Sequence, residues 1–229
     1  MSYSCPYELC DGSGLRYDQA TNTAYDCRCR PQVVARRRAQ SLSAVIPRRY
    51  REVSFDRPPL TEIEPRIVAA VRRFVTTIDE QLDNGRGLWF MGPPGTGKTT
   101  LAMLVSKAAL DAGRSVAIYS LPRLLNEIRD IHRADRSHID LLDRLTSVDL
   151  LHVDDVGAER TTDWVLEELY SIVNARYEDR RSIVVTTNIL DRDALCEQIT
   201  ERTVSRLTEI CDELPLIGID HRLERSMIA

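Results

Sequence analysis

From about Thr61 onward, the chain alternates long segments of helical hydrophobic periodicity with short runs of consecutive apolar residues. The periodic segments predict helices at about 64–83, 98–111, 122–133, 137–146, 162–179 and 191–208. The short runs predict five strands, at Leu88–Met91, Val116–Tyr119, Leu150–Val153, Ile183–Thr187 and Leu214–Ile217. Such alternation is typical of a doubly wound α/β domain, in which helices flank a five-stranded parallel sheet.

The first sixty residues lack this rhythm. Residues 1–30 contain two turn-forming clusters, Asp11-Gly12-Ser13-Gly14 and Thr21-Asn22-Thr23, and too few apolar residues to build a core. We therefore expect a separate small module there. Residues 31–60 are basic and rich in proline, which predicts a linker with one short helix at about 33–41. The α/β domain then occupies residues 61–229.

The composition fits one soluble domain with a small accessory module. The chain has 229 residues, of which 43% are hydrophobic and 29% charged. Its longest apolar runs, such as Ile67–Val71 and Leu101–Val105, stop at five residues, which excludes a transmembrane helix. The N-terminus has neither a basic start nor a hydrophobic stretch, so we expect no secretory signal, a cytoplasmic protein and reduced thiols.

The net charge of −4 argues against a protein coated in nucleic acid, but it conceals a local asymmetry. Between Arg30 and Arg51 there are seven arginines and no acidic residue, so any tendency to bind phosphates should be local. Only two of the 31 basic residues, Lys98 and Lys107, are lysines. A lysine at a special position is therefore informative.

Lys98 occupies such a position, directly after the first predicted strand. The segment fits the P-loop pattern G-x-x-x-x-G-K-[ST]. Its nucleotide-binding residues would be Gly92, Pro93, Pro94, Gly95, Thr96, Gly97, Lys98, Thr99 and Thr100. The glycines allow backbone N–H groups to surround a phosphate, and the following helix directs its positive dipole end at the same anion. Lys98 would reach the β and γ phosphates of ATP, and the Thr99 hydroxyl would bind Mg²⁺.

Two further predicted strands end in polar residues. Asp154 and Asp155 follow the apolar run that begins at Leu150. After a P-loop, the first acid would hold magnesium and the second would activate the attacking water, whereas alone they would more often form a cap or turn. Asn188 follows the strand at Ile183–Thr187, where its amide could contact the γ-phosphate or the water, or could simply form a turn.

These three segments, with Glu201-Arg202-Thr203-Val204-Ser205-Arg206-Leu207, resemble the AAA+ ATPases. The resemblance narrows to the DnaC/DnaI/IstB family, which comprises bacterial helicase loaders and helpers of DNA transposition. It extends from about residue 44 to 223. The residues that carry it are Ile46–Arg51 (IPRRYR), Ser54-Phe55-Asp56, Trp164–Arg176 (WVLEELYSIVNAR) with Tyr177, and Thr186-Thr187-Asn188.

The resemblance implies that Arg206 is an arginine finger, which reaches the γ-phosphate held by a neighbouring subunit. The active protein would then be an oligomer, with self-association completing each site. Arg202, one helical turn earlier, is the alternative finger, and both arginines could instead belong to a solvated helix face. Arg222 falls where the family has an arginine that senses nucleotide.

Two departures from common AAA+ proteins follow from the same comparison. Many members have glutamate where this chain has Asp155, whose side chain is shorter by about 1 Å, so we expect a slow, switch-like ATPase. Only seven residues follow Arg222, so we expect no C-terminal helical lid domain.

Residues 121–146 supply two helices where a minimal P-loop fold needs one. In initiators and loaders of this family, extra helices there line a pore for single-stranded DNA. Four arginines could contact DNA phosphates, or could pair with Glu127, Asp130 and Asp135 on a solvated face. These arginines are Arg123, Arg129, Arg133 and Arg136.

Four cysteines in the first module could bind zinc. Cys5 and Cys10 form one pair and Cys27 and Cys29 the other, although a single residue between the last two is an irregular spacing. A segment without a core can gain its fold from the metal. Unligated cysteines or a redox pair are the alternatives. The resemblance favours zinc, because DnaI-like loaders carry a cysteine-rich zinc module before the ATPase domain.

The hypothesis from sequence is therefore a helicase loader with ATP, Mg²⁺ and Zn²⁺ as cofactors. Its partners would be a hexameric replicative DNA helicase, docked by residues 1–30, and single-stranded DNA. ATP binding would favour assembly and hydrolysis would favour release. An IstB-like helper of transposition and an adaptor that binds ATP without hydrolysing it are the alternatives. A small-molecule P-loop kinase would need a phosphate-acceptor site and a mobile lid, and neither Asn188 at its strand end nor the Arg206 segment supports that class.

Overall fold

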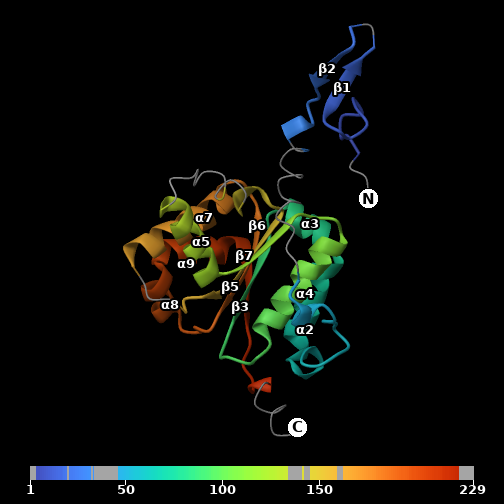
Figure 1. The fold of residues 1–229 in the computed structure, drawn as a ribbon. Helices are drawn as coiled ribbons and strands as arrows, with labels where there is room; N and C mark the ends of the chain where they lie inside the picture. Colours follow the sequence, from blue (N-terminus) through green and yellow to red (C-terminus); the bar gives the residue numbers. More distant parts are fainter. Residues whose placement is uncertain are drawn as a thin grey trace.

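The computed structural model describes residues 4–19, 21–31, 33, 46–133, 141, 145–158 and 162–221. Its larger part is a parallel sheet with helices on both faces (Figure 1). The sheet order is β4-β5-β6-β3-β7, which confirms the predicted five-stranded α/β fold. The strands are β3 (Gly87–Met91), β4 (Val116–Ser120), β5 (Leu150–Val156), β6 (Ser182–Thr187) and β7 (Cys211–Pro215).

Alternation along the strands divides the buried residues into two cores. Phe90 and Val184 face the layer of α2, α3 and α4, whereas Trp89 and Val185 face the layer of α5, α7, α8 and α9. The first layer comprises α2 (Pro65–Thr76), α3 (Ile78–Asp83) and α4 (Lys98–Asp111). The second comprises α5 (Leu121–Arg133), α7 (Asp163–Glu178), α8 (Arg192–Ile199) and α9 (Glu201–Ile210). Among the described helices, none combines the length and the hydrophobicity needed to cross a bilayer.

The helix predicted at 64–83 is in fact two helices. α2 ends at Thr76 and α3 begins at Ile78, with Thr77 between them at φ −110° and ψ 32°. The hydroxyls of Thr76 and Thr77 donate to the carbonyls of Arg72 and Arg73, at 2.8 and 3.1 Å. Such bonds to the preceding turn bend helices, so two consecutive threonines account for the break.

The prediction of one helix at 191–208 was also wrong. α8 ends at Ile199, and Thr200 adopts φ +73° while its hydroxyl accepts from the Thr203 N–H. Thr200 therefore ends one helix and caps the next. The last strand was misplaced as well, because β7 starts at Cys211 rather than Leu214. β7 lies at the edge of the sheet, and the acidic residues Asp212 and Glu213 interrupt its apolar residues. The hydrophobic pattern therefore does not indicate where this strand begins.

The remaining predicted helices have mixed outcomes. Those at 98–111, 122–133 and 162–179 are confirmed to within about one residue by α4, α5 and α7. The helices predicted at 137–146 and 33–41 lie largely outside the described residues. The cysteine-rich segment contains a hairpin that the sequence did not predict. Its strands, β1 (Leu15–Asp18) and β2 (Thr23–Asp26), pair antiparallel.

Residues 46–60, assigned from sequence to a linker, pack on the α/β domain. They include η1 (Arg48–Tyr50) and lead into η2 (Leu60–Glu62). Leu60 is 1% exposed, and Val53 and Phe55 pack against the same core as α2 and α4. Apolar residues spaced among arginines and prolines anchor this segment, so the domain begins earlier than residue 61.

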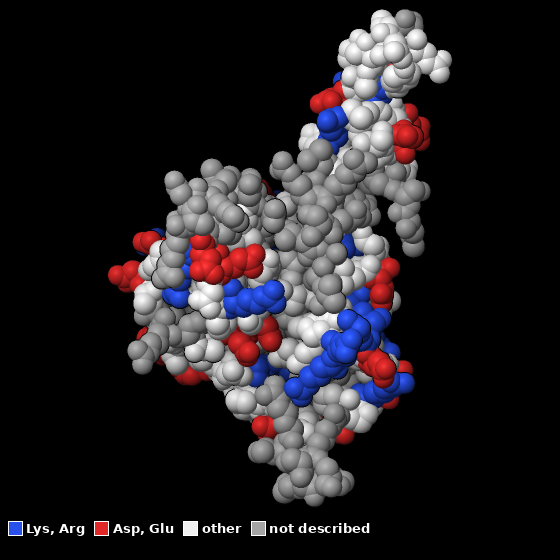
Figure 2. Space-filling model, viewed as in Figure 1, with Lys and Arg blue, Asp and Glu red and all other residues white. Residues whose placement is uncertain are grey.

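Surface charge is uneven on the face drawn in Figure 2. Acidic and basic side chains alternate over the α5 side, whereas basic side chains gather where the segment around η1 lies beside α2 and α4. Arg48, Arg49 and Arg51 belong to that segment and were part of the basic stretch recognised in the sequence. These three arginines are therefore held on the surface of the α/β domain.

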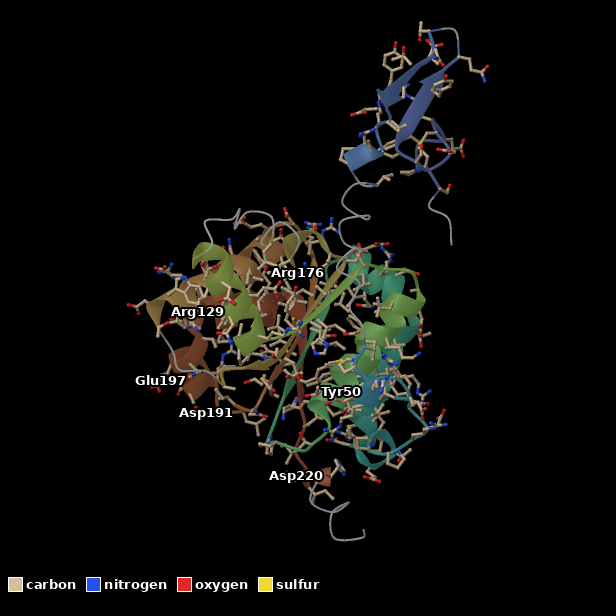
Figure 3. All side chains as sticks on the ribbon, viewed as in Figure 1. Tyr50, Arg129, Arg176, Asp191, Glu197 and Asp220 are labelled. Atoms are coloured by element: carbon tan, nitrogen blue, oxygen red, sulfur yellow. The ribbon has the colours of Figure 1, made fainter. Side chains whose placement is uncertain are left out.

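Arg176 of α7 is a fully buried cation (Figure 3). Its guanidinium donates to five backbone carbonyls, and the two shortest bonds, to Ser182 and Leu145, are 2.5 and 2.6 Å long. The other three acceptors are Thr146, Val148 and Asp149. Burial lowers the pKa of Arg176 to about 9, so it remains charged at neutral pH. One side chain therefore joins α7, the start of β6 and the segment preceding β5.

Replacing Arg176 by methionine should strongly destabilise the domain. Methionine preserves an unbranched side chain but leaves several buried carbonyls without donors, and we expect a loss of at least about 3 kcal/mol in unfolding free energy. Urea denaturation measures the change. Arg180→Met, at an exposed arginine one turn further along, is the matched control and should change stability by less than about 0.5 kcal/mol. Equal midpoints for the two variants would contradict this role for Arg176.

Candidate functional site

The P-loop joins the end of β3 to the start of α4. Gly92 N–H donates to the Thr187 carbonyl of β6 at 3.2 Å, which ties the loop to the neighbouring strand. Gly97 precedes α4 with φ +96°, and a Cβ there would lie 2.6 Å from Ile63 Cδ1. The conformation favours glycine, and a Cβ would also require the Ile63 side chain to move. The first turn of α4 thus directs its N–H groups at the loop, as an anion-binding helix does.

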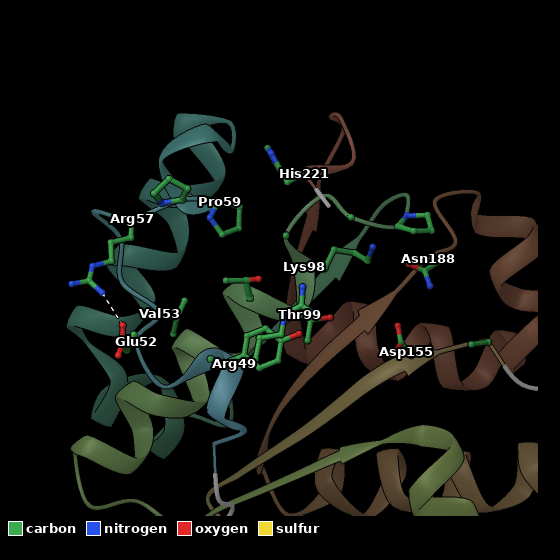
Figure 4. A pocket seen from close by; sticks show the side chains of 17 residues that line it. Arg49, Glu52, Val53, Arg57, Pro59, Lys98, Thr99, Asp155, Asn188 and His221 are labelled. Atoms are coloured by element: carbon green, nitrogen blue, oxygen red, sulfur yellow. Dashed lines mark hydrogen bonds and ion pairs between the residues drawn. The ribbon is translucent and has the colours of Figure 1, made fainter. Parts of the chain in front are cut away.

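A cavity of about 660 Å³ lies over this loop (Figure 4). Lys98 is 5% exposed, and its Nζ donates to the Pro93 carbonyl at 2.7 Å, which folds the ammonium back over the loop. Lys98 and Thr99 line the centre of the cavity, with Asp155 and Asn188 on one side and Val53 and Pro59 on the other. The cavity is therefore polar at the P-loop, and its opposite wall combines the apolar Val53 and Pro59 with charged residues that include Arg49 and Arg57.

The two carboxylates at the end of β5 lie in a β-bulge. Between Val153 and Val156, β5 advances three residues while its partner β6 advances two, from Val185 to Thr187. Asp155 adopts φ +59°, a left-handed conformation that aspartate tolerates better than most residues. The bulge separates the two side chains: Asp154 lies beneath the cavity against Thr99, and Asp155 lines it.

Asp154 is held by two hydroxyls from different elements. Thr99 Oγ1 donates to it at 3.0 Å, and Thr186 Oγ1 of β6 donates at 2.7 Å. Burial alone raises the pKa of Asp154, but the nearby His152 imidazole and these two hydroxyls outweigh that effect and hold the pKa below its usual value. Asp154 is therefore ionised at neutral pH. An ionised carboxylate beside a P-loop hydroxyl is a suitable donor set for Mg²⁺.

Thr186 and His152 support this carboxylate, and neither was assigned a role from sequence. Thr186 Oγ1 also accepts from the Asp155 N–H at 2.9 Å, so one hydroxyl fixes both acids. His152 is fully buried, with Nδ1 2.9 Å from Ser106 Oγ of α4 and Nε2 3.9 Å from Asp154 Oδ1. In the sequence, both appear as polar residues within hydrophobic strands. Their role beside Asp154 becomes evident only once β5 and β6 are paired.

Sequence reasoning also missed the far wall of the cavity. Arg49, Tyr50, Val53, Arg57 and Pro59 line it, although they were assigned to a linker. His221 closes it from the C-terminal side. The backbone N–H of His221 donates to the Gly95 carbonyl at 3.2 Å, and the ring Nδ1 lies 3.0 Å from Glu62 Oε2.

None of the described arginines that the sequence predicted to contact ATP or DNA lines this cavity. Arg206 of α9 lies outside this cavity, with its guanidinium stacked on Tyr177 of α7 at 4.1 Å. Arg123 and Arg129 lie on α5, and Arg129 stacks on Trp164 at 4.7 Å (Figure 3). Arg222 and Arg136 lie outside the described residues, and the side chain of Arg133 is not described. The structure therefore brings together Lys98, Thr99, Asp154, Asp155 and Asn188, but not Arg206.

The four cysteines of the N-terminal segment form a compact cluster. Their Sγ atoms all lie within 4.8 Å of one another, with Cys5 and Cys27 3.8 Å apart and Cys10 and Cys29 3.5 Å apart. Tetrahedral zinc with bonds of about 2.3 Å would separate its sulfur ligands by about 3.8 Å. The donor set and its geometry therefore fit zinc.

The pKa shifts within the cluster fit a set of thiols that binds a cation. Burial raises the pKa of Cys5, but backbone hydrogen bonds from Leu9 and Tyr7 outweigh it and lower the value to about 6. Burial and three neighbouring thiols raise the pKa of Cys29. Four such thiols cannot all ionise without a positive charge among them.

The sheet order, the P-loop between β3 and α4, and the acids at the end of β5 define a P-loop nucleotide-binding domain of the AAA+ class. Residues 35–228 match the family model for IstB-like ATP-binding proteins. The chain belongs to this family.

Individual relatives agree with this assignment. The chain is 30% identical to an uncharacterized Escherichia coli K12 protein, YdaV, over 130 residues, which are 57% of this chain and 52% of YdaV. It is 28% identical to the replicative helicase loader DnaC of the same strain over 141 residues, or 61% of this chain and 56% of DnaC. These matches span about half the length of the two relatives. A crystal structure of the DnaC helicase loader aligns with a TM-score of 0.67 and 27% identity, covering 75% of this chain and all of that one.

Removing the Thr186 hydroxyl should weaken the binding of Mg²⁺ together with ATP. Thr186→Val preserves shape but leaves Asp154 and the Asp155 N–H without their shared partner. We expect an affinity for Mg²⁺ in the presence of ATP that is lower by about 10-fold or more. Titration of Mg²⁺ at fixed ATP, followed by hydrolysis and by nucleotide fluorescence, measures it. Thr186→Ser retains the hydroxyl and should stay near wild type, and equal Mg²⁺ dependence in Thr186→Val would refute the role.

Proposed function

We propose that this chain is an ATP-dependent loader of a replicative DNA helicase, in which ATP binding favours assembly and hydrolysis favours release. The observation that carries the proposal is the cavity formed by Lys98, Thr99 and the Asp154 network, in a chain similar to DnaC through most of its α/β domain. A buried lysine and an ionised carboxylate under one cavity are suitable for binding a nucleotide with its magnesium ion. Because Thr186 of β6 holds this carboxylate, nucleotide binding can alter the conformation of that strand, as a switch requires.

In this proposal, Lys98 and the N–H groups from Gly95 to Thr99 bind the phosphates, and Thr99 with Asp154 holds Mg²⁺. When bound, the ion neutralises charge on the phosphates. Asp155 accepts a proton from the attacking water, and Asn188 orients the γ-phosphate or that water. The apolar wall of Val53 and Pro59, with the ring of Tyr50, receives the nucleoside end.

Arg206 completes the site of a neighbouring subunit. Arg206 does not line the cavity of its own chain and instead stacks on Tyr177. This position supports a contact with the γ-phosphate bound by a neighbouring chain. Hydrolysis then requires self-association, and the ATPase should be slow in the isolated chain. Arg222 remains a proposed contact to nucleotide.

Single-stranded DNA is the second proposed ligand, bound through α5. Arg123 is exposed there, and the Arg129 guanidinium lies over the Trp164 ring. An indole next to arginine adds an aromatic surface that the sequence did not suggest near this helix. The contacts we propose are mainly to phosphates, so binding should weaken steeply with salt.

The cysteine module docks the helicase in this proposal, with zinc bound by Cys5, Cys10, Cys27 and Cys29. Tyr17 and Tyr25, on its hairpin, are 62% and 49% exposed, and Leu9 is 44% exposed. Exposed aromatic and aliphatic side chains on so small a unit support a protein partner.

Co-assembly with a hexameric replicative helicase tests the function. We expect the chain to co-elute with the helicase in ATP and Mg²⁺ and to separate from it when nucleotide is removed. Lys98→Ala should lower the bound fraction about 10-fold, because the phosphates lose their charged partner. Lys107→Ala changes the only other lysine, which is half-buried on α4 and paired with Asp111, and should behave as wild type.

The alternative is an IstB-like helper of transposition, which the family match itself favours. In that case the chain would ignore the helicase and form an ATP-dependent complex with a transposase and DNA. Assembly with the transposase alone would therefore refute the loader proposal. Assembly with the helicase but no hydrolysis, even with single-stranded DNA, would identify an adaptor.

Zinc should be present at one ion per chain in protein purified without chelator. Cys29→Ser removes a fully buried ligand, so we expect loss of the metal and rapid proteolysis of residues 1–30. Elemental analysis and limited proteolysis measure both effects. Cys196→Ser, at a cysteine outside the cluster, is the control and should retain the zinc. Native protein without zinc would exclude the metal centre.

A further inference from the structure

Arg206 lies in a small network of side chains between α7 and α9. Its Cζ is 4.1 Å from the centre of the Tyr177 ring, and its Nε donates to Asn174 Oδ1 at 3.3 Å. Neither contact uses the two Nη groups, which are the donors that a phosphate oxygen would accept from. The guanidinium is therefore held by its face and by its Nε edge.

The partners of Arg206 are themselves fixed. The Tyr177 hydroxyl donates to Glu209 Oε1 at 2.8 Å, and Glu209 lies one turn beyond Arg206 on α9. Asn174 Nδ2 donates to Glu178 at 2.9 Å, which orients its carbonyl oxygen towards Arg206. The hydrogen bond to Glu209 also raises the pKa of Tyr177, so the ring carries a neutral hydroxyl at physiological pH. The Tyr177 side chain thus cannot easily turn away from the arginine.

Arg202 provides a comparison on the same helix. Its guanidinium lies 5.9 Å from the centre of the Tyr170 ring, and the arginine is exposed. A contact at that distance restrains the side chain weakly, whereas stacking at about 4 Å with a hydrogen bond restrains it strongly. Of the two arginines considered from sequence, Arg206 is the one whose direction the fold determines.

We propose that Tyr177 is a positioning residue for the arginine finger. It holds Arg206 against the α7–α9 surface, so that the guanidinium reaches the neighbouring subunit's nucleotide already oriented. The inference rests on the proposed role of Arg206. Orientation before contact matters because a misplaced group loses most of its effect on the rate, even when it is present.

Steady-state hydrolysis by the full chain with single-stranded DNA gives the first test. Tyr177→Ala should lower kcat about 10-fold. KM for ATP should change less than about 2-fold, because Tyr177 does not line the cavity that binds ATP in the same chain. Tyr177→Phe retains the ring and should keep at least about half of kcat. An equal loss in both variants, or wild-type kcat in Tyr177→Ala, would overturn the inference.

Mixing of variants distinguishes positioning from a structural role. Asp154→Asn supplies subunits with an intact Arg206 and Tyr177 but an inactive site, and Tyr177→Ala supplies intact sites. In an equimolar mixture, half of the sites are intact and half of these face a competent finger, so about a quarter of wild-type activity should return. A Tyr177→Ala chain that was damaged in its own site would not be rescued.

The same mixture with Arg206→Ala separates this inference from the function on which it rests. If Arg206→Ala is not rescued by Asp154→Asn, the finger assignment fails. If Arg206→Ala is rescued and Tyr177→Ala is not, only the positioning role fails. Thermal denaturation checks folding, and Tyr177→Leu, which retains apolar volume against α9, replaces Tyr177→Ala in every arm if the alanine variant does not fold.

Discussion

The hydroxyl of Thr186 is the contact on which the arrangement of the site depends. It donates to the Asp154 carboxylate and accepts from the Asp155 N–H, so a single atom of β6 fixes both acids of β5. Without this hydroxyl, the Asp155 N–H in the β5 bulge would lose this acceptor, and Asp154 would lose one of the two hydroxyls that hold it. Because Thr99 binds the same carboxylate from α4, the P-loop helix and two strands meet in one network.

Much of the fold and of the nucleotide site could be predicted, because the signals were local. The P-loop is a contiguous pattern, and buried parallel strands appear as short apolar runs. What could not be predicted depends on contacts between distant residues. Thr186 becomes meaningful only once β5 and β6 are paired, and Val53 and Pro59 become a wall only once residues 46–60 pack beside α4. The breaks at Thr77 and Thr200 reflect hydroxyl bonds that periodicity does not record.

The separation of Arg206 from the P-loop cavity has a consequence for regulation. If Arg206 acts in trans, as we propose, one chain can bind nucleotide alone but depends on a neighbour for rapid hydrolysis. The proposed switch would therefore respond to assembly as well as to ATP. Binding to a helicase ring could set the rate by bringing α9 of one subunit to the cavity of the next.

The walls of the cavity suggest how occupancy could reach the rest of the chain. Segments from both sides of the sequence close on the P-loop: Glu62 and Ile63 from before the sheet, and Asp220 and His221 from after it. His221 contacts Glu62 and the Gly95 carbonyl together, so the two segments are joined across the loop. A nucleotide in this cavity would lie beside Tyr50, Val53 and Pro59, which belong to the segment that follows the cysteine module in the sequence. If the module binds a partner, as we propose, residues 46–59 are the part of the chain best placed to couple that partner to the nucleotide, because they line the cavity and lie next after the module and its linker in the sequence.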